Sequence, residues 1–192
     1  MEGRFVEPPW HAPLDAEREI RAMPDGVRVR GLLITPMLAE VKRRGVTRVP
    51  PRERYVAFNL YPLRELARVL VDTSGDLFPD RSLRHGLRKL GRIAPTAFGA
   101  TTLGKVTLGS ALGVQAIVEA FAKGYELNMQ PGRAVVMESK SRSIVVSLDD
   151  VYHFIDSHHV GAFEGALAHA GVRGTVKIAL RGSCGADLLL EW

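Results

Sequence analysis

The sequence predicts an α+β fold in which an N-terminal helical layer packs on a C-terminal antiparallel sheet. Apolar residues recur at helical spacing through the first two-thirds of the chain. At residues 133–138 and 144–148 the period changes to two on either side of a polar turn at 139–143, which is typical of a β-hairpin. One helical stretch and two further strands, at residues 175–180 and 187–192, complete the predicted sheet.

The length and composition indicate one domain with a short extension. A chain of 192 residues that is 46% hydrophobic and 24% charged can bury one sizeable core. We expect an N-terminal extension at residues 1–26 and an α+β domain at residues 27–192. Within the domain, residues 27–131 should be mainly helical, and residues 132–192 should form the hairpin, a helix and two strands.

Turn and capping residues define the first elements. Residues 15–22 are a short helical candidate, and residues 27–29 alternate with arginines as a short strand would. Thr35 is expected to cap the first long helix, with Pro36 in the first turn, where proline is tolerated, and Gly45 at the end.

The later helices are expected between boundary residues of the same kinds. One helix should begin at Tyr61-Pro62 and end at Gly75, and Asp80 should cap the next. A further helix should lie between Ser110 and Gly124, and the last should begin at Asp149 or Asp150 and end at Gly171. Between residues 93 and 124, glycines interrupt the apolar helical stretches. Such glycines let a second helix or a ligand approach the backbone closely.

A row of arginines marks the helix that follows Asp80. These residues recur at three- and four-residue spacing, opposite a row of leucines, and are Arg81, Arg84, Arg88 and Arg92. With the formal net charge of +5, the row predicts a solvated basic face that could bind a protein partner. No recognition helix or stacking aromatic motif accompanies the charge, so we expect no nucleic-acid binding.

The segment from Gly99 to Thr107 is similar to a phosphate-binding P-loop, with Lys105 in the lysine position. Its hydroxyl residue comes one position late, which turns the hydroxyl by about 100° around a helix, away from a bound magnesium ion. The preceding residues also indicate a helix end and a turn instead of a buried strand. A nucleotide-binding enzyme is therefore the alternative that we rank last.

Histidines gather in the sequence after the predicted hairpin. His153, Asp156, His158 and His159 are of residue types that bind transition metals. On a regular helix, however, adjacent histidines point about 100° apart, and residues six apart lie on nearly opposite faces. The sequence therefore predicts no metal site, and since no catalytic constellation stands out either, it predicts a protein that is not an enzyme.

Cysteine content and hydropathy indicate the compartment. The single cysteine, Cys184, excludes an internal disulfide and a multi-cysteine zinc site, which suits a reducing cytoplasm. No apolar run approaches the roughly 18 residues of a membrane span. The N-terminus lacks the basic end and apolar centre of a signal peptide. We therefore expect a cytoplasmic protein.

Several short motifs between Arg28 and Trp192 resemble a known family. They are Val29-Arg30-Gly31-Leu32-Leu33, Tyr61-Pro62-Leu63, Phe78-Pro79, Leu87-Arg88-Lys89-Leu90-Gly91-Arg92 and the glycine-containing turn before Leu188. The chain resembles a family of uncharacterised myxobacterial paralogues, which is distantly similar to haem/nitric-oxide-binding domains, vinyl-reductase-type (V4R) ligand-sensing domains and Bet3-type subunits of the transport protein particle. This resemblance implies the α+β architecture, an apolar cavity between helices and sheet, and a homodimer.

Two departures from these relatives concern cofactors. Haem-binding members have an axial histidine in the helix before the hairpin, where this chain has the run from Phe121 to Tyr125, and their Tyr-x-Ser-x-Arg motif is missing. The C-terminal cysteines of metal-containing V4R sensors correspond to residues such as Ala179 and Ala186, with only Cys184 nearby. The comparison therefore predicts no cofactor, neither haem nor zinc.

The predicted function is that of a non-enzymatic regulatory or adaptor module that binds an apolar small molecule. The residues expected to line its cavity are Phe98, Leu103, Leu108, Leu112, Phe121 and Phe163. The alternative is an assembly or scaffold protein without a ligand. In that case these residues are closed core, and the sheet edge or the arginine row binds a partner.

Overall fold

The computed structural model describes residues 4–46, 50–109, 111 and 113–192, with side chains described throughout except at residues 102, 103 and 107. The C-terminal part forms a four-stranded sheet in the order β4-β5-β7-β6, in which every neighbouring pair is antiparallel. The strands are β4 (Arg133–Lys140), β5 (Ser143–Asp149), β6 (Thr175–Leu180) and β7 (Ala186–Glu191). The predicted sheet is confirmed.

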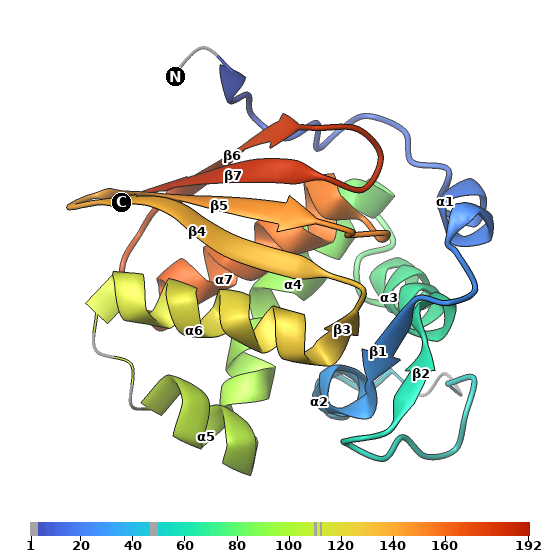
Figure 1. Cartoon of the computed structure of the whole chain (residues 1–192). Helices are drawn as coiled ribbons and strands as arrows, with labels where there is room; N and C mark the ends of the chain where they lie inside the picture. Colours follow the sequence, from blue (N-terminus) through green and yellow to red (C-terminus); the bar gives the residue numbers. More distant parts are fainter. Residues whose placement is uncertain (1–3, 47–49, 110, 112) are drawn as a thin grey trace.

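Helices cover one face of this sheet (Figure 1). They are α4 (Leu83–Gly99), α6 (Gly113–Asn128) and α7 (Val160–His169). α6 packs against β4, α7 packs against β6 and β7, and α4 packs against α7. Ile144 and Val146 of β5 are fully buried in the apolar cluster between the sheet and the helices. The α+β class, with a helical layer on an antiparallel sheet, is therefore confirmed.

A small second sheet joins distant parts of the chain. β1 (Arg28–Arg30) lies between β2 (Leu60–Pro62) and β3 (Met129–Gln130), and both pairings are antiparallel. Arg30 strengthens the junction, because its guanidinium donates to the carbonyl oxygens of Phe58 and Leu127 at 2.8 and 3.0 Å. The end of α6 is thereby held beside the N-terminal helices.

The segment before β1 packs on the rest of the molecule. It contains α1 (Ala16–Ala22), which matches the predicted short helix. Val6 pairs with Ile178 of β6 through two backbone hydrogen bonds of 2.9 Å. The Trp10 ring lies 3.5 Å from the guanidinium carbon of Arg88. Residues expected to form an extension thus contact both the sheet and α4.

The second helix begins one turn earlier than predicted. α2 (Gly31–Arg43) contains both Thr35, the predicted cap, and Pro36, the predicted first-turn residue. Carbonyl oxygens of Asn59 and Ala57 accept hydrogen bonds from the first two backbone N–H groups of α2, at 3.0 and 2.8 Å. A loop distant in sequence therefore caps this helix, and local signals could not show it.

The predicted cap of α4 is also wrong. Asp80 lies in a turn that is closed by a 3.1 Å hydrogen bond from the Arg81 N–H to the carbonyl oxygen of Phe78. The cap is instead Ser82, whose hydroxyl accepts from the backbone N–H of His85. Both residue types suit a cap, and the turn decides between them.

Two helices run past the glycines that were expected to end them. α3 (Leu63–Leu77) continues through Gly75, and α6 continues through Gly124. An interior glycine costs a helix only about 1 kcal/mol, which tertiary packing readily outweighs.

The last helical region starts later than the predicted Asp149 or Asp150. β5 extends to Asp149, and two residues with positive φ follow, Asp150 (+55°) and Phe154 (+46°). A helical turn with π geometry, η2 (Ile155–His159), then leads directly into α7. The chain between β5 and η2 is therefore a compact loop.

α4 crosses η2 and α7 with their backbones in direct contact. A Cβ atom added at Gly161 would lie 2.0 Å from the carbonyl oxygen of Arg88, and one added at Gly91 would lie 2.1 Å from that of His158. Only glycine fits at such distances, so these residues fix how closely the helices approach.

We expect Gly161→Ala to destabilise the fold by about 1–3 kcal/mol, because the methyl group would force the two helices apart. The matched control is Gly75→Ala, at an exposed site in α3 where an added Cβ meets no atom within 4 Å of the described chain. The control should stabilise by about 0.5–1 kcal/mol. Urea unfolding of both variants measures the difference, and equal effects would contradict the close crossing.

Among the described residues, no helix has both the length and the apolar content that a bilayer span requires.

Candidate functional site

A cavity of about 90 Å³ lies among the helices. Its walls come from α2, α3, α4, α6, α7 and β3, and from the loop and π turn that precede α7. The predicted location between helices and sheet is therefore wrong, because among the described residues no strand of the four-stranded sheet lines the cavity. α6 and α7 separate the cavity from that sheet.

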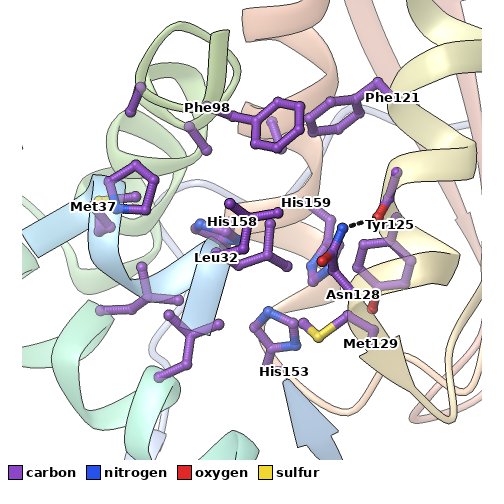
Figure 2. A pocket seen from close by; sticks show the side chains of 18 of the residues that line it. Leu32, Met37, Phe98, Phe121, Tyr125, Asn128, Met129, His153, His158 and His159 are labelled. Carbon is purple, nitrogen blue, oxygen red and sulfur yellow. Dashed lines mark hydrogen bonds between the residues drawn. The ribbon is translucent and has the colours of Figure 1, made fainter. Parts of the chain in front are cut away.

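One end of the cavity is aromatic. Phe98, Phe121 and Phe163 line it, and Figure 2 shows the rings of Phe98 and Phe121 side by side. The rings of Phe121 and Phe163 meet edge to face, with centroids 5.3 Å apart. Leu108 is buried but does not line the cavity. The other two residues that the sequence put forward are not placed, because the Leu103 side chain and Leu112 lie outside what the structure describes.

The other end of the cavity holds three histidines. One ring nitrogen each of His153, His158 and His159 lies within 4.8 Å of the others. The ring centroids of His153 and His159 are 4.4 Å apart, and Figure 2 shows both rings beside Asn128 and Met129. The prediction that these histidines could not share one site is therefore wrong.

Local backbone geometry explains the convergence. The positive φ of Phe154 reverses the chain immediately after His153, so that this ring folds back over the following turn. His158 and His159 belong to a π turn, in which successive side chains are spaced differently from those of an α-helix. The angles of a regular helix, on which the prediction depended, do not apply here.

Burial keeps these imidazoles neutral. It lowers the pKa of His153 well below the usual value, that of His158 to about 3 and that of His159 to about 4. Repulsion among the three rings acts in the same direction for His153 and His158, whereas backbone hydrogen bonds at Phe154 and His153 oppose the shift of His159. At neutral pH each ring therefore offers a free lone pair.

Several ring nitrogens in this group lack partners. Within the described part of the chain, neither nitrogen of His158 has a hydrogen-bond partner, and Nδ1 of His153 and of His159 also has none. Buried polar atoms are nearly always hydrogen-bonded, so this concentration of unpaired nitrogens marks a candidate site. The sequence signal was present in the three histidines, but their convergence depends on backbone angles.

The arginine row forms the predicted solvated face only at Arg81 and Arg92, which are exposed. Arg84 pairs with Asp156 of η2, and the guanidiniums of Arg88 and Arg92 both pair with the carboxylate of Glu164 in α7. The Arg84 and Arg88 side chains are only 13% and 19% exposed. The row therefore joins α4 to η2 and α7. Arg81, which precedes the helix, is exposed.

The P-loop-like segment also has a structural explanation. The residues before Gly99 belong to α4, and α5 (Thr102–Gly109) follows after a two-residue turn. The Thr101 hydroxyl caps α5 by accepting from the backbone N–H of Gly104 at 3.0 Å. No strand of the described chain leads into this turn, so the geometry of a phosphate-binding loop is not formed.

A family model described as "Protein of unknown function (DUF2378)" matches residues 25–192. The chain belongs to the DUF2378 family. Comparison with curated proteins gives no match for this DUF2378 chain.

Solved structures show that this DUF2378 chain has the fold of H-NOX domains. One is an oxygen-binding H-NOX domain related to soluble guanylate cyclases, with 12% identity, a TM-score of 0.65, and coverage of 84% of this chain and 94% of that one. Another is the Fe(II) unliganded H-NOX protein from K. algicida, with 12% identity, a TM-score of 0.59, and coverage of 84% and 95%. The predicted resemblance to haem/nitric-oxide-binding domains is thus confirmed for the fold.

A further H-NOX structure, from work on haem distortion, covers 85% of this DUF2378 chain and 94% of its own, with 11% identity and a TM-score of 0.64. This fold family therefore implies a haem, but the residues present here do not fit one. Cofactor sites usually measure roughly 300–1,000 Å³, against about 90 Å³ here. Among the described residues, no lysine or arginine lines the cavity to pair with propionates, and Phe121 and Tyr125 fill the wall on α6.

Proposed function

We propose that this protein is a non-enzymatic regulatory module that binds a small apolar molecule in the cavity among its helices. The observation that carries the proposal is the cavity itself, whose wall is almost entirely apolar except at the histidine end. The H-NOX-like fold supports a sensing role, since the related structures include a domain described as oxygen-binding. We further propose that the protein is cytoplasmic and that it forms homodimers.

The volume limits the size of the ligand. Pockets for drug-sized ligands measure roughly 300–1,000 Å³, so a cavity of about 90 Å³ suits a much smaller molecule. Apolar cavities of this kind stay dry and take up xenon or benzene. A gas or a small hydrocarbon is therefore the ligand class that the geometry favours.

Xenon is a suitable probe for this cavity. We expect xenon to shift the methyl and ring resonances of Leu32, Phe98 and Phe121 in NMR spectra, because these side chains line the cavity. Ala120→Leu should weaken xenon binding about tenfold or more, because the larger side chain fills the cavity wall.

The matched control for this experiment is Ala116→Leu. Ala116 lies one turn earlier on α6, is half-buried, and does not line the cavity. Xenon binding should be unchanged in this variant. A well-folded wild-type protein that shows no xenon-induced shifts, or equal binding in the two variants, would contradict the proposal.

The second candidate is an assembly module without a ligand. Phe58 and Leu127 are 67% and 61% exposed, and Arg30 holds their backbones together. Exposed apolar groups that lie close together are typical of protein interfaces. Failure of the xenon experiment, together with a dimer in light scattering, would favour this candidate.

A further inference from the structure

The histidine end of the cavity has features that an apolar pocket does not need. The ring centroid of His158 lies 5.7 Å from that of His153 and 5.5 Å from that of His159, so each ring is close to both of the others. His153 and His159 are 2% and 3% exposed. Placing three imidazoles together out of water is unfavourable unless their nitrogens find partners.

Hydrogen bonding within the described chain does not supply those partners. The unpaired atoms are the Nδ1 atoms of His153 and His159 and both nitrogens of His158. Each unsatisfied buried polar atom is destabilising. The Nδ1 atom of His159 is therefore available to a group from outside the described chain.

The distances are close to those of a metal site. Three nitrogens at about 2.0–2.1 Å from one ion in tetrahedral geometry are roughly 3.3 Å apart. Here the three candidate atoms lie within 4.8 Å of one another. Side-chain rotations that move each nitrogen by about 1 Å would therefore bring all three onto a common ion. The backbone is held in place meanwhile, because Gly91 of α4 packs directly against the His158 carbonyl group.

We propose that His153, His158 and His159 together bind one divalent transition-metal ion, such as Zn²⁺ or Co²⁺, at the inner end of the cavity. Imidazole nitrogens suit zinc, copper, nickel and iron, and three of them leave one tetrahedral position open. The ion would be held by protein side chains alone, without a porphyrin. If the proposed function also holds, a small molecule in the cavity would complete the coordination.

Metal titration of the chelator-treated protein tests this proposal. We expect one equivalent of Co²⁺ to bind and to give the intense visible absorption of a tetrahedral site, and Zn²⁺ to displace it. His159→Phe keeps a ring in the same packing and should weaken binding of Zn²⁺ about 100-fold or more, as measured by calorimetry. His158→Gln provides a second variant that preserves size.

His169→Ala is the control, because His169 is exposed at the end of α7, outside the cluster. Its affinity for Zn²⁺ should equal that of the wild type. Absence of binding to folded wild-type protein, or equal affinity in His159→Phe and His169→Ala, would overturn the metal site. Ala120→Leu separates the two proposals, since it should reduce xenon uptake but leave Zn²⁺ binding intact.

Discussion

Acidification from pH 7 to about pH 4 should destabilise the metal-free protein by several kcal/mol, because three buried histidines are neutral in the folded state. Their folded pKa values are depressed, to about 3 for His158 and about 4 for His159, whereas in the unfolded chain each returns to about 6.5. The unfolded state therefore binds more protons below pH 6.5. The stabilisation is fully present above that pH and is lost as the pH falls, by up to about 1.4 kcal/mol per histidine per pH unit.

Urea unfolding at half-unit steps between pH 7 and pH 4.5, with a chelator present, measures this slope. The decline should begin near pH 6.5, above the range in which carboxylates titrate. His159→Phe should lower the slope by about one proton per molecule. His169→Ala, at an exposed residue outside the group, is the control variant. A flat profile down to pH 5 would mean that the histidines are not buried as described.

Arg88→Met should destabilise the fold by about 3–5 kcal/mol, because it leaves a buried carboxylate with less compensation. Glu164 is only 4% exposed in its side chain, and Arg88 donates to it through both Nε and a terminal nitrogen. The remaining partner, Arg92, is 52% exposed and donates through Nε. Methionine preserves much of the volume, so the loss reports mainly on the ion pair and on the stacking with Trp10.

Arg43→Met is the matched control. Arg43 also makes a two-point contact with a carboxylate, that of Glu40, but on the outer surface of α2. Exposed ion pairs of this kind contribute little, so the control should have nearly wild-type stability in urea. If both variants lost the same amount, Arg88 would be a surface residue and the packing of α4 on α7 would have to be revised.

The sheet could be predicted because its signals are local. Alternation over residues 133–138 and 144–148 specifies which face is buried, and the intervening polar residues specify the turn. The register then follows, with Val136 opposite Val146. The start of α2 could not be predicted, because its caps come from Ala57 and Asn59 in a distant loop.

The candidate site could be predicted only in its apolar half. Phe98, Phe121 and Phe163 are apolar residues on helix faces, and such residues turn toward a common interior. The histidine half depends on the positive φ of Phe154 and on the π turn after it, neither of which has a sequence signature. Regular helical periodicity therefore predicted different directions for three histidine side chains that the actual backbone brings together.

The arginines show a related limit. Their spacing correctly placed Arg84, Arg88 and Arg92 on one helix face, but spacing cannot tell whether a charged face meets water or carboxylates. Here the acidic partners, Asp156 and Glu164, come from a segment more than seventy residues later in the chain.

The nitrogen NMR signals of the histidine rings test the central claim most directly, namely that His153, His158 and His159 form one buried, neutral group at the end of the cavity. At pH 7 we expect all three rings to be unprotonated and to stay so down to pH 5. Addition of one equivalent of Zn²⁺ should shift one nitrogen of each of the three rings together. Ring signals that titrate near pH 6.5, or that respond to Zn²⁺ singly or not at all, would contradict the account.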